Sequence, residues 1–468
     1  MSGRVDSLIR QCLSGVSTRL EYRVSVRLRS RNILIAAGAL LTLSGCAPTV
    51  TVENNSGVAS STGANAAASG GAGAGGWSPT SASGSGGSSA STTGSGDPPG
   101  SDEAVAYQIN AGHSGAVEND SLTPPLTMRW SRNLGAQVSY PLIAGGRVFV
   151  TTGSSNFTAK LIALEQKTGN TVWGPIALGG SSPASYAAYE GGKVFTINYD
   201  GEVRAFEADT GTELWSMHLP STGKFNSPLT ALGGKIYITG GYAPDSIFAV
   251  SEATGALLWK RSYAPTENWN LPAASAKGLY FTCACAAVCG LEGMAGGDLW
   301  APAQGCVGNG RGRTLLSEGR LYVSANLGYP NEQGAVFDAA TGGKVGEFQQ
   351  DASIAFHKGR GFFLSYSGGS PILTAKSVPE MVPLWSFAGD GSFSTTPIVV
   401  NGNVYMGGTS GTVAAIDEIT GVPVWSQNLG LGESIDDSSN WQDAPRMGLA
   451  AGGGALLVPA HQYLAAFW

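Results

Sequence analysis

The most regular feature of the chain is a short run of alternating apolar and polar residues that follows a glycine. Copies of this run lie about 40 to 50 residues apart, and a fixed period of this length is typical of repeat folds. Alternation with a period of two, interrupted by glycine turns, predicts β-hairpins. Eight copies occur, at Gly146–Val150, Gly192–Phe195, Gly234–Tyr237, Gly278–Phe281, Gly319–Tyr322, Gly359–Phe362, Gly402–Tyr405 and Gly454–Leu457.

A tryptophan ends most copies of the repeat, usually three residues after a Thr-Gly pair, as in Thr168-Gly169 with Trp173. A large flat ring at one fixed place per repeat fills the same space each time, so we expect it to pack between neighbouring units. A role for all of these rings in stacking on a cofactor is not expected. The predicted packing residues are Trp130, Trp173, Trp215, Trp259, Trp300, Trp385 and Trp425.

Units of about four antiparallel strands at this spacing predict an all-β fold, an eight-bladed β-propeller over residues 106–468. The two ends of the repeat region complement each other. Leu126–Leu134, centred on Trp130, has the pattern of an outermost strand alone, whereas Gly454–Trp468 has inner strands and no outermost one. We therefore expect the N-terminal strand to complete the last blade, which removes a free sheet edge.

An export signal is predicted over residues 1–46. Arg27, Arg29 and Arg31 precede the apolar run Ile33–Leu43, which is too short to span a bilayer that needs roughly 20 residues. The run leads into Leu43-Ser44-Gly45-Cys46, which resembles the bacterial lipobox. That resemblance implies lipidation of Cys46 and a bacterial cell-envelope lipoprotein. Ala47 rather than aspartate after the cysteine implies the outer membrane.

Residues 47–105 consist largely of Gly, Ser, Ala and Thr, with nearly no large apolar residue. Such a segment has little apolar surface to bury, so it cannot offset the entropy cost of becoming ordered. We expect a disordered linker that tethers the propeller to the membrane. Charged residues make up 13% of the chain and the net charge is −6, which disfavours nucleic-acid binding.

The repeat of apolar strand, acidic residue, Thr-Gly and Trp resembles the PQQ-type propeller repeat of the quinoprotein alcohol dehydrogenase-like superfamily. In size and lipidation the chain is similar to the BamB-like outer-membrane lipoproteins. The lead-in Tyr107–Asn110, with His113, resembles the opening of PQQ-repeat lipoproteins. These resemblances imply a non-catalytic scaffold for a protein or cell-wall partner, which acts as a monomeric propeller without a cofactor.

The alternative function is a PQQ-dependent quinoprotein dehydrogenase with PQQ and Ca²⁺. The family's enzymes need a catalytic Asp, oxygen ligands for Ca²⁺ and a vicinal Cys-Cys disulfide, and this chain has no adjacent cysteines. Its four histidines, His113, His218, His357 and His461, are scattered over different repeats without a nucleophile motif. Asp209, Asp338 and Asp417 precede Thr-Gly turns, where we expect their carboxylates to cap backbone groups. We therefore predict no catalytic residue, no metal site and no enzyme activity.

Four cysteines cluster in the fourth repeat, and when this repeat is aligned with the second they surround the tip of a hairpin. In an exported protein four cysteines predict two disulfides, whose three possible pairings the sequence does not separate. Zinc binding through the Cys-x-Cys-x₃-Cys spacing is the alternative, although alternating strand positions suit tetrahedral geometry poorly and no histidine lies nearby. The cysteines are Cys283, Cys285, Cys289 and Cys306.

The loops that enter the innermost strands converge at one mouth of the predicted propeller. Their side chains differ between otherwise similar repeats, whereas packing demands would repeat, so they are candidates for contact with a ligand or partner. The alternative is that they are solvated loop residues. The candidates are Tyr140, Tyr186, Asn226, Trp269, Asn270, Arg313, Asp351, Phe393, Trp441 and Asp443.

Overall fold

The computed structural model describes most of the chain after residue 101. The described residues are 102–468 without 118, 155–158, 241–246, 263–270, 284–287, 301–311, 326–332, 350–352, 368–369 and 437–445. They all belong to one compact unit, Ser88–Trp468. The predicted signal, Cys46 and nearly all of the predicted linker lie outside the described residues. Within the described part no helix is long and apolar enough to cross a membrane.

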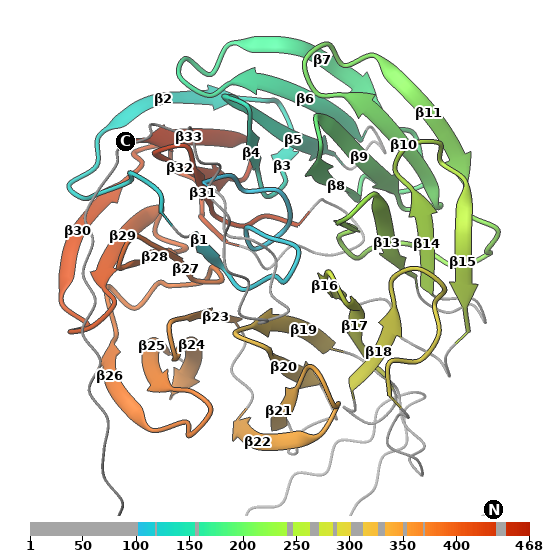
Figure 1. Cartoon of the computed structure of the whole chain (residues 1–468). Helices are drawn as coiled ribbons and strands as arrows, with labels where there is room; N and C mark the ends of the chain where they lie inside the picture. The colour runs from blue at the N-terminus through green and yellow to red at the C-terminus, as the bar shows by residue number, and fades with distance from the viewer. Residues whose placement is uncertain are drawn as a thin grey trace, which may run out of the picture. The chain divides into compact units, whose positions relative to one another are not determined.

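Eight β-sheets form an eight-bladed propeller, as the repeat predicted (Figure 1). Blade 1 comprises β4 (Leu142–Ala144), β5 (Arg147–Gly153), β6 (Lys160–Glu165) and β7 (Thr171–Ala177), and β3 (Gln137–Val138) also pairs with β5. Blade 2 comprises β8 (Ser185–Glu190), β9 (Lys193–Asn198), β10 (Glu202–Glu207) and β11 (Glu213–His218). Blades 3 and 4 comprise β12 (Thr230–Ala231), β13 (Lys235–Thr239), β14 (Ile247–Ser251) and β15 (Leu257–Arg261), and β16 (Ala273–Ser275), β17 (Gly278–Thr282) and β18 (Val288–Glu292).

The second half of the ring repeats the arrangement. Blades 5 and 6 comprise β19 (Gly312–Ser317), β20 (Arg320–Ala325), β21 (Gln333–Asp338) and β22 (Lys344–Gln349), and β23 (Ser353–His357), β24 (Arg360–Ser367), β25 (Ser370–Ser377) and β26 (Pro383–Phe387). Blade 7 comprises β27 (Ile398–Val400), β28 (Asn403–Gly407), β29 (Thr412–Asp417) and β30 (Pro423–Asn428), and β1 (Ala116–Val117) pairs parallel with β27. Blade 8 comprises β31 (Ala450–Gly452), β32 (Ala455–Ala460), β33 (Tyr463–Phe467) and β2 (Met128–Asn133).

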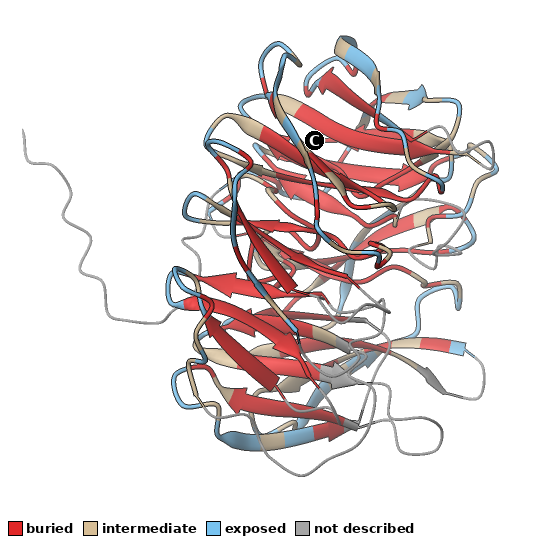
Figure 2. Ribbon diagram, turned by 90° about the vertical axis from the view of Figure 1, so that its right-hand side faces the viewer, coloured by how far each residue is buried: buried red, intermediate tan, exposed pale blue. Residues whose placement is uncertain are grey.

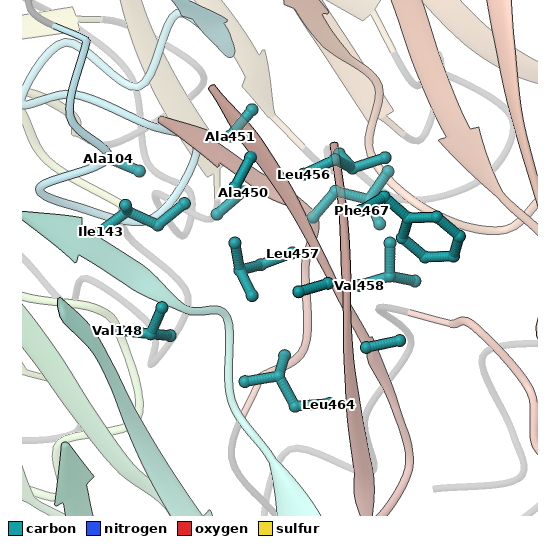
Figure 3. Packing of buried hydrophobic residues seen from close by; sticks show 14 of the residues in the cluster. Ala104, Ile143, Val148, Ala450, Ala451, Leu456, Leu457, Val458, Leu464 and Phe467 are labelled. Atoms are coloured by element: carbon teal, nitrogen blue, oxygen red, sulfur yellow. The ribbon is translucent and has the colours of Figure 1, made fainter. Parts of the chain in front are cut away.

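The N-terminal strand closes the ring, which confirms the prediction from the complementary ends. Strand β2 pairs antiparallel with the C-terminal strand β33, with Ser131 opposite Ala465 (Figure 1). Apolar side chains of β32 and β33, among them Leu457 and Phe467, join one buried cluster with Ile143 and other side chains of blade 1 (Figure 3). Each such side chain stabilises the fold by about 1.5–3 kcal/mol when it is fully buried. The closing blade is therefore fixed by backbone pairing and by packing.

Burial decreases from the inner strands of each blade to the outermost strand (Figure 2). In blade 1, six of the seven residues of β5 are buried, whereas β7 has none that is fully buried. The inner strands have blades on both faces, and this explains why their apolar runs are nearly continuous. The outermost strands face solvent on one side and alternate in exposure.

The repeated tryptophans join each blade to the next one. The indole N–H of Trp130 donates to the carbonyl of Gln166 at 2.9 Å, and Trp173 donates to Ala208 at 2.9 Å. Trp215, Trp259 and Trp385 make the same bond to the following blade. A Cβ built on Gly169, whose φ is +69°, would lie 2.7 Å from the Trp130 ring. The glycine of the Thr-Gly turn therefore provides both the left-handed turn and the space for the preceding tryptophan.

Trp300 packs against a ring of its own blade, and Trp425 packs against a ring of the next blade. Trp300 stacks on Tyr280, with ring centroids 5.6 Å apart, and Trp425 packs edge-on against Phe467 at 5.5 Å. Trp425 thus lies at the junction between blade 7 and the closing blade. All seven tryptophans singled out in the sequence are in the described part of the chain.

The aspartates near the Thr-Gly turns fall into two groups. Asp338 and Asp417 lie three residues before the threonine, and each carboxylate accepts hydrogen bonds from the threonine N–H and hydroxyl. Asp209 lies one residue before its threonine, and its carboxylate pairs with Arg147 of blade 1 at 2.9 Å. The expected capping role is therefore wrong for Asp209, because it lies two residues closer to the threonine than Asp338 and Asp417 do and pairs with the neighbouring blade.

A disulfide joins Cys283 and Cys289 at the hairpin between β17 and β18. Cys283 directly follows β17, and Cys289 is paired with Phe281 across the hairpin, so the bond clamps the hairpin tip. It uses two of the four thiols that the zinc alternative would need. Cys285 and Cys306 lie outside the described residues, and a second disulfide stays a prediction.

Reduction of this disulfide is expected to lower the free energy of unfolding by about 2 kcal/mol, because the bond closes a loop of only a few residues. The measurement is urea unfolding of the oxidised protein and of the double variant Cys283→Ser/Cys289→Ser. The variant Ser377→Ala, at a part-buried surface strand of another blade, is the control. Equal midpoints for the oxidised protein and the double variant would contradict a stabilising clamp.

Candidate functional site

One register position on the innermost strands varies in residue type from blade to blade, apart from a tyrosine in both blade 1 and blade 2. Each innermost strand pairs with its neighbour in the same register, so that Leu142 lies opposite Phe149 and Ala450 opposite Leu457. We call the end of the ring at which the innermost strands begin the mouth. The residue two positions before Leu142, and before its equivalent in each other blade, lies at this mouth. Because packing alone would select similar residues, this variation marks the mouth as the candidate site. The position holds Tyr140, Tyr186, Pro228, Leu271, Arg313, Ser353, Thr396 and Gly448.

Two of the predicted mouth residues, Tyr140 and Tyr186, come together in blades 1 and 2. Both side chains are buried, and the Tyr140 hydroxyl donates to the carbonyl of Ala187 at 2.7 Å. Burial raises the pKa of Tyr186 to about 12 and raises the pKa of Tyr140 further, while Arg446 partly offsets both shifts. Both hydroxyls therefore stay neutral at physiological pH and act as hydrogen-bonding groups rather than as bases.

The N-terminal lead-in adds Tyr107 to this cluster. Its ring lies edge-on to Tyr140 with centroids 5.3 Å apart, and its hydroxyl is 3.4 Å from Thr396 Oγ1 of blade 7. The Arg446 guanidinium lies 5.3 Å from the centroid of the Tyr107 ring, within the range of a cation–π contact. A Cβ on Gly448 would approach this ring to 3.3 Å, so the glycine leaves room for it. We call Tyr107, Tyr140, Tyr186 and Arg446 the tyrosine–arginine cluster.

Asn226 of blade 3 is buried with its side-chain amide unsatisfied. It is 5% exposed, and neither its Oδ1 nor its Nδ2 makes a hydrogen bond within the described part of the chain. The adjacent Phe225 fixes the segment, because its ring lies within 2.6 Å of the Cβ positions of both Gly201 and Gly240. A buried amide without partners costs free energy, so it is a group that a bound molecule could satisfy.

The other predicted mouth residues do not join the cluster. Arg313 is half-buried, and its backbone forms an isolated parallel β-bridge with Leu271 between blades 4 and 5. Phe393 is 3% exposed and packs against Phe387 at 5.9 Å, so it fills a turn of blade 6 rather than lining the mouth. Trp269, Asn270, Asp351, Trp441 and Asp443 lie outside the described residues.

Sequence reasoning missed Arg446 and the role of Tyr107. Tyr107 precedes the repeats and Arg446 follows a long interval between β30 and β31, so neither has a counterpart at the same place in other blades. No periodic signal could therefore identify them. Their separation of more than 300 residues in the chain also hides their contact until the ring has closed.

The described residues do not fit PQQ with Ca²⁺. Calcium in such a site needs carboxylate and amide oxygens close together. The tyrosine–arginine cluster contains no carboxylate, and no group of three or more His, Cys, Asp or Glu side chains that could hold a metal ion occurs among the described residues.

A carboxyl pair lies between blades 2 and 3, away from the mouth. Glu252 follows β14 and is 6% exposed, and Glu190 ends β8 and accepts the N–H of Gly233 at 2.7 Å. Burial, followed by the hydrogen bond to Glu190, raises the pKa of Glu252 to about 9, and Lys193 and Lys235 partly offset this shift. The equivalent place between blades 6 and 7 holds His357 and Glu418, whose side chains lie 2.8 Å apart.

The raised pKa of Glu252 predicts that alkaline conditions destabilise the ring. The folded state holds a proton on Glu252 that the unfolded chain releases near pH 4.5. The stability that Glu252 contributes is therefore fully present below pH 4.5 and is lost as pH rises toward 9. Glu252→Gln, which keeps the shape without a charge, is expected to be more stable than the native chain at pH 8, on the order of 1–3 kcal/mol. Denaturant unfolding at pH 5 and pH 8 measures this difference. The control Glu380→Gln changes an exposed carboxylate and should leave the pH profile unaltered.

Comparisons with known proteins agree with this architecture. A family model described as outer membrane protein assembly factor BamB matches residues 125–243, 160–344 and 243–467. The outer membrane protein assembly factor BamB of Moranella endobia (strain PCIT) is 25% identical over 248 residues, which cover 51% of this chain and 55% of that relative. The chain therefore matches only about half the length of this relative.

Solved structures share the fold at low identity. BamB from Moraxella catarrhalis gives a TM-score of 0.55 at 16% identity and covers 73% of this chain and 99% of that one. Quinohemoprotein alcohol dehydrogenase from Comamonas testosteroni gives 0.60 at 13% identity and covers 78% and 80%. These likenesses concern the propeller alone and do not separate a scaffold from a dehydrogenase. Because the family model spans all eight blades, the chain belongs to the family of the outer membrane protein assembly factor BamB.

Proposed function

We propose that this protein is a non-catalytic lipoprotein of the bacterial cell envelope, and that its propeller mouth binds a protein or cell-wall partner. Arg446, the partly exposed member of the tyrosine–arginine cluster, carries the proposal, because arginine is among the residues that dominate binding energy at protein interfaces. The buried tyrosines lie behind it, and the Tyr107 ring contacts its guanidinium. The family supports a role in assembly rather than in catalysis. The propeller acts as a monomer in this proposal, and the partner class is the proteins of outer-membrane assembly.

Site-specific photocrosslinking in cells tests whether the mouth meets a partner. A photoreactive amino acid replaces Arg446, which is half-exposed beside the Tyr107 ring. The same replacement at Asp209, whose side chain is 78% exposed at the opposite end of the blades, is the matched control. We expect crosslinks to an envelope component from position 446 alone. Crosslinks from both positions, or from neither, would contradict a partner-binding mouth.

The alternative function, a PQQ-dependent dehydrogenase, is tested on the purified exported protein. PQQ and Ca²⁺ are added, and the quinone absorption spectrum and the reduction of an artificial electron acceptor by alcohols are recorded. We expect no bound quinone and no turnover. Bound quinone together with dye reduction would overturn the scaffold proposal in favour of the enzyme.

Cys46 carries the proposed lipid anchor, with residues 1–46 as the signal and 47–105 as the tether. Cys46→Ala is expected to move the protein from the membrane fraction to the soluble envelope fraction, because a single tether without lipid has no apolar surface to insert. Immunoblots of fractionated cells measure the distribution, and Cys12→Ala serves as the control. Unchanged membrane retention of Cys46→Ala would mean that another segment anchors the protein.

A further inference from the structure

The lead-in segment 102–117 crosses the middle of the ring before the chain reaches the closing strand β2 (Figure 1). Its backbone meets the innermost strands near the ends where these strands finish, opposite to the mouth, whereas the Tyr107 side chain reaches the mouth. We call the end where these strands finish the strand-turn end of the axis. Gly145 and Gly453, which lie in the turns after β4 and β31, contact the start of the segment through Glu103 and Asp102.

Six innermost strands donate one backbone N–H each to carbonyls of this segment, all from the same register position. The carbonyls that accept these bonds belong to Ala104, Val105, Ala111, Gly112, Ser114 and Gly115, at N···O distances of 2.7–2.8 Å. The donors are Ile143, Tyr189, Ala274, Leu316, Phe356 and Val399, in blades 1, 2, 4, 5, 6 and 7. These N–H groups lie on the free inner edges of the sheets, which would otherwise have no backbone partner.

The two remaining blades contact the segment in other ways. Gly453 N of blade 8 donates to the carbonyl of Asp102 at 2.6 Å. His113 Nε2 lies 3.0 Å from Thr230 Oγ1 of blade 3, and its Nδ1 lies 2.6 Å from the carbonyl of Tyr107. One segment therefore contacts all eight blades. The pairing of β2 with β33 closes the ring without involving these contacts.

The segment keeps a conformation that it would not adopt alone. Ile109 has a φ of +79°, which is unfavourable for a β-branched residue, and Gln108 and His113 also have positive φ values. The Asn110 Oδ1 accepts the N–H groups of Gly112 and Ser114 and holds the turn. Such strain persists where surrounding contacts determine the structure, and Ile109 is only 2% exposed.

We propose that residues 102–117 form an internal strap that ties the inner edges of all eight blades together and closes the strand-turn end of the axis. At the mouth, Arg446 is the partly exposed member of the tyrosine–arginine cluster, and this is the end that a partner reaches in the proposed function. The strap is a second closure of the ring, separate from the pairing of β2 with β33. It also fixes the point at which the tether joins the propeller.

Hydrogen exchange measured by NMR on the full exported chain tests this proposal. The six donor amides should exchange as slowly as the paired amides of β9 and β20. Gly112→Val wedges the strap away from blade 5, since a Cβ there would lie 2.8 Å from the Leu316 carbonyl. In this variant we expect all six donor amides to exchange on the order of tenfold faster or more, because they lose one shared strap. Gly343→Val is the matched control, because its Cβ meets only the Thr341 hydroxyl at 3.3 Å and, like Gly112, Gly343 has no positive φ.

Two results would overturn the strap. Donor amides in the native chain that exchange as fast as those of exposed loops would mean that the segment does not occupy the axis. Acceleration in Gly112→Val confined to Leu316 would mean that the six bonds are independent. If Gly112→Val yields no folded protein, Gly112→Ala replaces it, because its single Cβ makes the same close contact with the Leu316 carbonyl. The exchange rates of the native chain still decide whether the segment occupies the axis.

Discussion

Replacing Trp130 with alanine is expected to lower the free energy of unfolding by about 3–5 kcal/mol, the usual cost of removing a buried tryptophan. Trp130 is 9% exposed, and its indole joins the closing strand to blade 1 through the carbonyl of Gln166. The Gln166 side chain in turn donates to the carbonyl of Gly452 at 2.9 Å, so blades 8 and 1 are linked twice at this place. The substitution therefore weakens the one junction where the ring is closed by non-consecutive strands.

Urea unfolding of Trp130→Ala measures the loss, and Trp215→Ala is the matched control. Trp215 makes the same bond, to the carbonyl of Glu252, but it joins two blades that follow each other in the chain. Both variants should be destabilised, whereas only Trp130→Ala should accelerate hydrogen exchange in β33, because that strand then loses its outer partner. Equal exchange in β33 for the two variants would show that Trp130 has no special part in closure.

Acid is expected to destabilise the propeller through His113 by about 3 kcal/mol. His113 is fully buried, and burial lowers its pKa to about 4 from the ordinary 6.5, although hydrogen bonds to Tyr107 and Pro272 act in the opposite direction. Between pH 6.5 and 4 the unfolded chain binds a proton that the folded chain does not. The contribution is therefore fully present above pH 6.5 and is lost as pH falls toward 4.

In the Glu252→Gln background, His113→Asn removes this titration and should flatten the pH profile of stability between 6.5 and 4. It should also lower stability at pH 7, because the bonds to blades 3 and 4 are weakened. His461→Asn is the control, because the His461 side chain is 56% exposed and should leave the slope unchanged. Asp338 and Asp417 have lowered pKa values through their bonds to threonine, so they titrate below this window. The opposite effect of Glu252 offsets that of His113 over part of this range in the native chain, so the deciding chain is Glu252→Gln. Constant stability of Glu252→Gln from pH 6.5 to 4 would contradict the prediction.

The two pH effects have opposite signs and separate locations. Glu252 contributes stability that is lost as pH rises from 4.5 toward 9, and His113 contributes stability that is lost as pH falls from 6.5 toward 4. Stability should therefore be greatest in the weakly acidic range, where the losses from both groups are incomplete. The double variant His113→Asn/Glu252→Gln should have a flatter profile than either single variant, since the two sites share no contact in the described structure.

The sequence by itself determined the number of blades and how the ring closes, because both depend on a local pattern that is repeated. Glycine turns at a constant spacing define hairpins without reference to distant residues. Gly454–Trp468 lacks an outermost strand and Leu126–Leu134 supplies one, so their pairing followed from what each fragment was missing. The position of Cys283 and Cys289 at a hairpin tip could also be inferred by alignment with another blade.

Only the tertiary structure decided the path of residues 102–117, the pairing of Cys283 with Cys289 and the contact of Tyr107 with Arg446. These features involve segments outside the repeat or choices between equivalent partners, so they leave no periodic trace in the sequence. The strap depends mainly on backbone carbonyls, which every residue possesses, and side-chain patterns cannot reveal where such bonds go. The tyrosine–arginine cluster likewise exists only once the closed ring brings both ends of the chain to the same axis.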